Sequence, residues 1–203
     1  MYKRQDVSKL KQFSADRIDN MLRYWFGLRG VRMPSTSWLN EMRTQLLEAK
    51  HDAQLCVTHA DCHIRRHRDR VYITPKFDPD LLLQPPRSFN WQGEASLHFP
   101  SFGGTLYFDP AEQGIAVDWL RAQTLAIQLR SGGERLKPAW NRPTKSLKYQ
   151  YQACDVPAWE RERLPLVFAG KQLLFAAGIG MDCHPLNPEA GANIQLRWQF
   201  DQT

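Results

Sequence analysis

Six basic side chains are concentrated in one short stretch of the sequence. Between residues 130 and 148 they are accompanied by a single acid, Glu134, and they are Arg130, Arg135, Lys137, Arg142, Lys145 and Lys148. Lys and Arg on a glycine turn and on the first turns of a helix can contact successive phosphates, and the amides at the helix start can add to them. Such cation density predicts salt-sensitive binding to a polyanion without reading of sequence. An ordinary solvated surface is the alternative.

The charge of the whole chain is distributed in three blocks. Residues 1–74 hold 14 basic and 8 acidic side chains, residues 75–125 hold 3 and 6, and residues 126–203 hold 10 and 7. Two basic blocks around an acidic spacer suggest two contact surfaces for a polyanion.

A second group has the residue types that ligate zinc, namely Cys56, His59, Cys62, His63 and His67. On alternating strands Cys56 and His59 point to opposite faces, and so do neighbours in the chain such as Cys62 and His63. The spacing also lacks the paired knuckles of structural zinc sites, so we expect no metal here. A zinc-stabilised or protein-interaction adaptor is nevertheless the alternative function. Cys154 and Cys183-His184 are too isolated to form a nucleophilic pair, and we expect reduced thiols throughout.

The elements that must position these residues form an α+β protein. Ile18, Leu22, Trp25 and Phe26 make an apolar stripe that predicts a helix from Ser14 to Leu28, and Pro34-Ser35 opens a second helix. Alternating strands then follow over residues 54–59, 62–67 and 70–74. Residues 6–74 are therefore predicted to be a small helical and β domain.

Residues 75–123 are rich in Pro and Asp and are predicted to be a linker with short strands at 94–99 and 105–108. Residues 124–203 are predicted to form a β-rich α+β domain. Its strands fall at 124–130, 166–168, 172–175 and 194–200, with a helix at 144–153. Trp159, between Pro157 and Pro165, could stack on a nucleotide, but packing in its own domain is favoured.

No apolar run approaches the roughly 20 residues needed to cross a bilayer, and the first residues lack a signal-peptide pattern, so we expect a cytosolic protein without membrane contact. Residues 1–5 are expected to be a basic tail or an assembly artefact, since Tyr2-Lys3-Arg4-Gln5 is what one frame of a common transposase sequencing adapter encodes.

A series of short motifs follows the glycine pair in a fixed order: Gly132-Gly133, Arg135, Lys137, Ser146-Leu147-Lys148, Val156-Pro157-Ala158-Trp159-Glu160-Arg161 and Pro165-Leu166. This order resembles the C-terminal domain of bacterial tRNA(Ile)-lysidine synthetases. That family often has a second Lys where this chain has Tyr149, which puts a cationic contact there in doubt.

The first domain is similar to the substrate-binding domain of the same family, through Arg17, Leu22-Arg23, Trp25, Pro34-Ser35, Asp52-Ala53, Ile64-Arg65-Arg66 and Val71-Tyr72-Ile73. The resemblance covers roughly residues 10–74 and 125–200. Each motif is weak alone, and their common order carries the match.

The resemblance implies a ligase that uses ATP to attach lysine to the wobble cytidine of the isoleucine tRNA with a CAU anticodon. In that family the reaction belongs to an N-terminal PP-loop domain with an S-G-G-x-D-S motif, which would take the ATP, Mg²⁺ and L-lysine. The resemblance also implies a homodimer for the full-length enzyme. Here Ser131-Gly132-Gly133 continues as Glu134-Arg135, and Pro138 prevents the helix that would hold phosphate, so we expect no ATP site and no activity from this chain alone.

The expected role is therefore to bind and position tRNA, with the second domain on the acceptor stem. Recognition of an A-form stem would rest on shape, charge and 2′-hydroxyl contacts. The candidate RNA-binding residues are Arg135, Lys137, Arg142, Lys145 and Lys148, then Arg130 and Arg161, and in the first domain Arg17, Arg23, Arg65 and Arg66.

Overall fold

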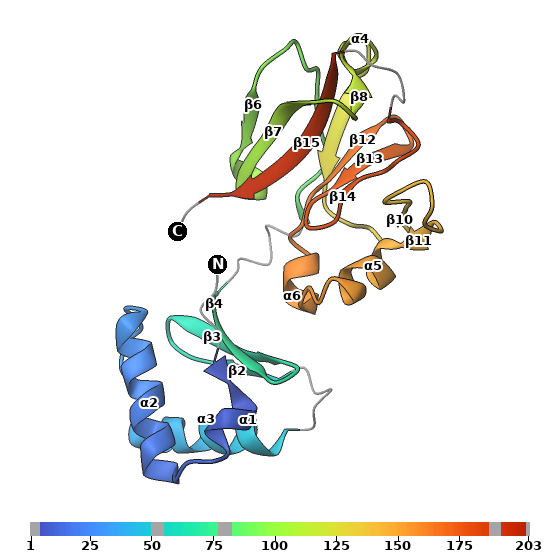
Figure 1. The fold of residues 1–203 in the computed structure, drawn as a ribbon. Helices are drawn as coiled ribbons and strands as arrows, with labels where there is room; N and C mark the ends of the chain where they lie inside the picture. The colour runs from blue at the N-terminus through green and yellow to red at the C-terminus, as the bar shows by residue number, and fades with distance from the viewer. Residues whose placement is uncertain (1–4, 50–54, 77–82, 187–191, 202–203) are drawn as a thin grey trace. The chain divides into compact units, whose positions relative to one another are not determined.

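The computed structural model describes residues 5–49, 55–76, 83–186 and 192–201 (Figure 1). The chain divides into two compact units, Met1–Phe77 and Asp78–Thr203, each with its own hydrophobic core. Both units mix helices and antiparallel sheets, which confirms the predicted α+β class. Within the described residues, no helix combines the length and the apolar character needed to cross a bilayer.

The first unit packs helices against one antiparallel sheet of order β1-β4-β3-β2. Its helices are α1 (Val7–Leu10), α2 (Ala15–Leu28) and α3 (Thr36–Glu48), and its strands are β1 (Gln5–Asp6), β2 (Cys56–Thr58), β3 (Cys62–His67) and β4 (Arg70–Pro75). The apolar stripe of α2 is buried in the core, as the spacing predicted. Ser35 caps α3, since its Oγ accepts the Trp38 amide at 3.2 Å.

The sheet of the first unit has a strand that the sequence did not predict. Gln5 and Asp6 pair with Val71 and Arg70 of β4, and the Asp6 carboxylate accepts the Ser8 amide at 3.0 Å to cap α1. A two-residue strand is too short to show a period of its own. The sequence placed residues 1–5 in a tail, whereas Gln5 is part of the sheet; residues 1–4 lie outside the described part.

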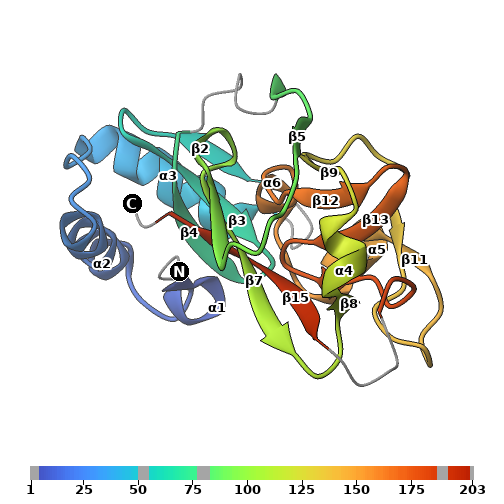
Figure 2. The same ribbon diagram turned by 90° about the horizontal axis from the view of Figure 1, so that it is seen from above.

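The second unit contains two larger antiparallel sheets that share one core, with orders β14-β13-β12-β9-β5 and β6-β7-β15-β8 (Figures 1 and 2). The strands of the first of these are β5 (Arg87–Phe89), β9 (Leu125–Gln128), β12 (Leu166–Ala169), β13 (Gln172–Ala176) and β14 (Gly180–Met181). Those of the second are β6 (Ser96–Phe99), β7 (Gly104–Ala111), β8 (Ile115–Ala116) and β15 (Asn193–Phe200), with the 3₁₀ helix η2 (Pro100–Phe102) and α4 (Val117–Arg121) beside them.

A third, two-stranded sheet pairs β10 (Arg135–Leu136) with β11 (Lys145–Ser146), and it leads into α5 (Leu147–Ala153) and then α6 (Ala158–Arg161). The helix predicted for residues 144–153 therefore begins at Leu147, because the preceding two residues pair with β10 instead. Trp159 is 9% exposed, in agreement with the packing role favoured from the sequence.

The predicted linker, residues 75–123, differs most from the structure. From β5 onward, residues 87–121 supply strands to both larger sheets and bury Trp91, Phe99, Phe102, Leu106 and Phe108 in the shared core. Their partners are distant in sequence: β7 pairs with β15 over the register Asn193↔Ala111 to Phe200↔Gly104. The Pro- and Asp-rich composition indicated a linker because local patterning carries no trace of such non-local pairing.

Arg66 is a buried cation that ends α3. On β3 it points into the core side and is 4% exposed. Its Nη1 donates to the carbonyls of Leu46 and Ala49, both at 2.9 Å, and its Nε donates to the carbonyl of Arg68 at 2.9 Å. The carbonyls left over at the helix end are thereby satisfied.

We expect Arg66→Met to destabilise the first unit by about 2–4 kcal/mol, because buried carbonyls lose charged donors that methionine cannot replace. Urea unfolding, combined with hydrogen exchange of the α3 amides, measures the loss and locates it. Arg29→Met, at an exposed position after α2, is the matched control and should change stability by less than about 0.5 kcal/mol. Equal effects of the two changes would contradict the capping role.

Candidate functional site

The cation-rich segment is held by three apolar side chains. Leu136 of β10 and Leu147 and Tyr151 of α5 are all 0% exposed. The Tyr151 hydroxyl donates to the Ala177 carbonyl at 2.9 Å, which ties α5 to the end of β13. Burial raises the pKa of Tyr151, so this hydroxyl keeps its proton and remains a donor. Leu147 and Tyr151, four residues apart, thus form the buried apolar face of α5.

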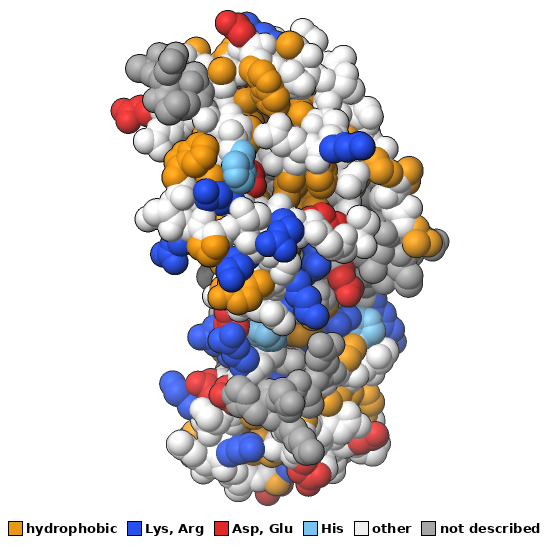
Figure 3. All heavy atoms as spheres, turned by 90° about the vertical axis from the view of Figure 1, so that its right-hand side faces the viewer, with side chains coloured by type: hydrophobic (Ala, Val, Ile, Leu, Met, Phe, Trp, Pro, Cys, Tyr) orange, Lys and Arg blue, Asp and Glu red, His pale blue; other side chains and the backbone are white. Residues whose placement is uncertain are grey.

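Opposite these anchors the structure places a set of cations on one short segment, which we term the basic face: Arg135, Lys137, Arg142, Lys145 and Lys148. Four of them are exposed and Lys137 is half-buried. Figure 3 shows Lys and Arg side chains gathered on this part of the second unit. Charges that face solvent so densely favour a polyanionic ligand.

Exposed aromatic rings are interleaved with the basic face. Trp140 is 61% exposed, with the Lys137 Nζ 5.4 Å from the centre of its ring. Tyr149 is 55% exposed, with the Lys145 Nζ 5.2 Å from its ring centre. Sequence reasoning selected only the cations. The sequence could have indicated Trp140 and Tyr149 as well, because both rings lie among those cations along the chain.

The glycine turn before β10 is filled by its own carboxylate. Glu134 accepts the amides of Ser131 at 2.6 Å and Gly132 at 2.9 Å, and φ is +100° at Gly132 and +86° at Gly133. A positive φ favours glycine at both positions. Burial raises the pKa of Glu134, but these hydrogen bonds outweigh it and leave the pKa below its usual range. The Ser131 and Gly132 amides are therefore already paired within the chain.

Two backbone amides at the start of α5 already have acceptors within the chain. The Leu147 amide donates to the Glu134 carbonyl at 2.9 Å, and the Tyr149 amide donates to the Ser146 Oγ at 3.3 Å. The expectation that amides at this helix start add to phosphate binding is not met by these two, because the chain itself satisfies them.

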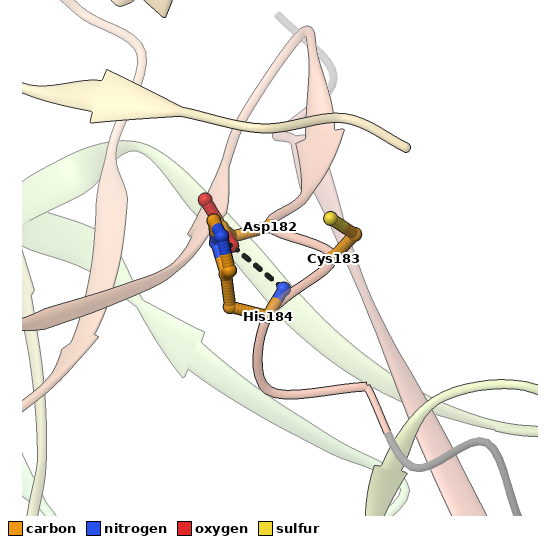
Figure 4. Close-up of side chains that lie close together, drawn as sticks. All are labelled: Asp182, Cys183 and His184. Carbon is orange, nitrogen blue, oxygen red and sulfur yellow. Dashed lines mark hydrogen bonds and ion pairs between the residues drawn. The ribbon is translucent and has the colours of Figure 1, made fainter. Parts of the chain in front are cut away.

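Asp182 fixes the other side of the segment (Figure 4). Its Oδ2 accepts the Lys137 amide at 2.9 Å, and its Oδ1 accepts the His184 amide at 2.8 Å and lies 2.6 Å from His184 Nδ1. In the part of the chain that is described, Asp182, Cys183 and His184 are the one group of such side chains close enough to share a metal ion. Both carboxylate oxygens already accept amides, and burial raises the pKa of the Cys183 thiol, so this group is better suited to holding the chain than to holding a metal.

Arg130 and Arg161 have partners inside the protein. The Arg130 guanidinium lies over the Tyr151 ring and 3.9 Å from the Glu134 carboxylate, and its side chain is 20% exposed. The Arg161 Nε donates to the Val156 carbonyl at 2.7 Å. Burial, with the nearby charge of Arg130, lowers the pKa of Arg161. Both arginines therefore contact other parts of the protein and stabilise the segment, and they add little to its exposed basic surface.

In the first unit the four candidate arginines are divided between α2 and β3. Arg17 is exposed on α2, with its guanidinium 4.5 Å from the Phe13 ring centre, and the Arg23 Nη2 donates to the Thr36 Oγ1 at 3.1 Å. Arg65 is half-buried on β3, and Arg66 is committed to α3. The structure does not gather them into a dense face like that of the second unit.

Two of the residues with zinc-ligand types, His59 and Cys62, are used for packing. His59 is 7% exposed and stacks on Phe26, with Trp38 against its edge. Burial raises the pKa of Cys62 to about 11, which disfavours the thiolate that zinc requires. All four cysteines are free.

Comparison with protein families identifies a domain in each unit. Residues 6–72 match the TilS substrate binding domain, and residues 125–198 match the TilS substrate C-terminal domain. A search of solved structures finds a crystal structure of a TilS C-terminal domain with a TM-score of 0.46 and 20% identity, which covers 59% of this chain and all of that one.

Full-length relatives carry the name tRNA(Ile)-lysidine synthase. The protein of Nitrosomonas europaea is 34% identical over 98% of this chain, and that of Ralstonia nicotianae is 36% identical over 87%. The chain covers 43% and 39% of these two relatives, so it spans about two fifths of their length.

We expect Glu134→Gln to destabilise the second unit by about 1–3 kcal/mol at pH 7, because an amide is a weaker acceptor for the turn amides than a carboxylate. The pKa of Glu134 in the folded state lies below the ordinary 4.5. The stability that its carboxylate contributes is therefore fully present above pH 4.5 and is lost as the pH falls through the folded-state pKa. Denaturant unfolding at several pH values should therefore show the difference from the unsubstituted protein shrinking in acid. Glu162→Gln, at an exposed position after α6, is the control, and a pH-independent difference would contradict this account.

Proposed function

The chain belongs to the tRNA(Ile)-lysidine synthase (TilS) family, and from this premise we propose that its two units bind and position tRNA for that enzyme. The second unit would hold the acceptor stem, and the first would contact the tRNA body. A cytosolic location is part of the same proposal. The observation that carries it is the basic face, which lies within the residues that match the substrate C-terminal domain.

The geometry of the basic face supports binding to a duplex backbone. Its cations lie on the short strand pair, in the loop that joins β10 to β11 and in the first turn of α5, and this segment is held by buried side chains and by two carboxylates. Exposed lysines and arginines on a fixed backbone can contact phosphates without ordering a loop first. Such contacts carry no base information, so affinity should depend strongly on salt.

For the first unit we propose a weaker contribution from Arg17, Arg23 and Arg65. Arg17 is exposed, and Arg23 is half-buried at the edge of the helix pair. Arg66 is left out of the proposal because its guanidinium already donates to three carbonyls inside the unit. Arg130 and Arg161 would act indirectly, through the shape of the segment.

The reaction that we propose for the whole enzyme joins lysine to the wobble cytidine of the isoleucine tRNA with a CAU anticodon, at the expense of ATP. ATP, Mg²⁺ and L-lysine would bind in a domain with an S-G-G-x-D-S motif, which this sequence does not contain. The nearest match, Ser131-Gly132-Gly133, does not fit ATP because Glu134 occupies its amides.

We expect the double variant Lys145→Ala, Lys148→Ala to weaken binding to an RNA duplex and to reduce the slope of log affinity against log salt by about 2, since each lost phosphate contact removes about 1. Fluorescence anisotropy at several salt concentrations measures both quantities. Lys171→Ala removes one charge from the exposed turn between β12 and β13, and it should leave the slope nearly unchanged. An unaltered slope in the double variant would remove both lysines from the interface.

We also expect this chain to consume no ATP when tRNA, L-lysine and Mg²⁺ are supplied together. The physical reason is that its glycine turn presents a carboxylate where a triphosphate would need free amides. Release of inorganic phosphate or pyrophosphate provides the measurement. Lysine-dependent turnover by purified protein would contradict the proposed division of labour.

A further inference from the structure

Trp140 is the most exposed of the seven tryptophans, all of which lie in the described residues. It sits in the loop between β10 and β11, in a turn closed by the Arg142 amide, which donates to the Ala139 carbonyl at 3.0 Å. Trp25, Trp91 and Trp159, by contrast, are at most 9% exposed. Folding stability does not account for an indole left in water, because burial of its apolar surface would be favourable.

The ring of Trp140 is nonetheless framed by neighbours. The Lys137 Nζ lies 5.4 Å from the ring centre, and the His184 imidazole meets the ring in a T-shaped arrangement with centroids 5.9 Å apart. Asp182 joins these two neighbours, because it accepts the Lys137 amide and also the His184 amide, the contact drawn in Figure 4. These contacts hold the indole in place while most of its surface stays exposed. Less conformational entropy is then lost when a ligand binds.

A flat open ring beside several cations suits a nucleotide. The base can stack on the indole while its phosphates meet the lysines and arginines around it, a combination typical of single-strand binding. Bases inside a duplex are stacked on each other and cannot reach a protein ring, so an unpaired nucleotide at a duplex end suits this ring best. The charge of the surroundings favours this polyanion over a protein partner, since the two acids that hold this segment, Glu134 and Asp182, are engaged by backbone amides.

We propose that Trp140 is a stacking platform for an unpaired nucleotide that adjoins the duplex held by the basic face. The proposal rests on the proposed function and deepens it: the RNA recognised would be a duplex end with a single-stranded extension, and not a duplex alone. Tyr149 has the same arrangement of open ring and lysine, which makes it a neighbouring surface of the same kind.

The test compares two RNA probes, a short blunt duplex and the same duplex with a few unpaired 3′ nucleotides, by fluorescence anisotropy with the full chain. We expect the extension to increase affinity about tenfold, in the range found for stacking of one base on an aromatic ring. Trp140→Leu should abolish that gain and change blunt-duplex affinity less than twofold, within about 0.4 kcal/mol by the same conversion. Trp140→Tyr should restore part of the gain, which a merely structural role would not require.

Trp119→Leu is the matched control, because Trp119 is 37% exposed on α4 beside Asp118 and outside the basic face. It should keep the full gain. Equal affinity of the unsubstituted chain for both probes, or a gain that survives Trp140→Leu, would overturn the stacking proposal and leave the proposed function standing. Failure to bind either probe at low salt would instead overturn the proposed function, and the stacking proposal with it.

Discussion

Two carboxylates that accept backbone amides hold the cation-bearing segment in its shape. Glu134 closes the glycine turn before β10, and Asp182 joins Lys137 to the residues that follow β14. A segment so rich in cations would otherwise repel itself and has few apolar side chains with which to collapse. Both carboxylates accept backbone amides and so fix the backbone. Among the described residues, neither forms an ion pair with a cation of the basic face. Its positive charge therefore remains available to a ligand.

Arginine has two opposite uses in this chain, and charge alone cannot separate them. Arg66 is buried and ends a helix, whereas Arg135 is exposed on a two-residue strand. The alternation of β3 did contain the signal: Arg66 falls on the same face as Cys62 and Ile64, which makes it a core position. Counting cations per domain thus overestimates the surface that can meet a polyanion. In the first unit, burial and the carbonyls at the end of α3 keep Arg66 away from the surface.

The sequence predicted those parts of the fold in which a local period is long enough to read. The stripe of α2, the cap of α3 and the hairpin of β3 and β4 are all of this kind. Within residues 87–121 the strands at 94–99 and 105–108 were predicted, but their place in a core was not, because β7 pairs with β15 up to 96 residues further along the chain. Gly104 illustrates the loss: it fell outside the predicted strands at 94–99 and 105–108, but in β7 it lies where an added Cβ would fall 2.5 Å from the Trp198 ring. For the site, the cations and the helix at 144–153 were predicted from the sequence, whereas the anchoring by Asp182 and the exposure of Trp140 depend on tertiary contacts.

A basic face and an open ring would contribute different things to RNA binding. Phosphates repeat along a duplex, so a row of cations binds equally well at neighbouring positions and leaves the duplex free to slide. A ring that accepts only an unpaired base is satisfied at a single place, the junction where pairing stops. Combining the two would therefore fix the register of the duplex without any contact to a paired base. The cations would supply most of the affinity, and the indole would determine where along the RNA that affinity is applied.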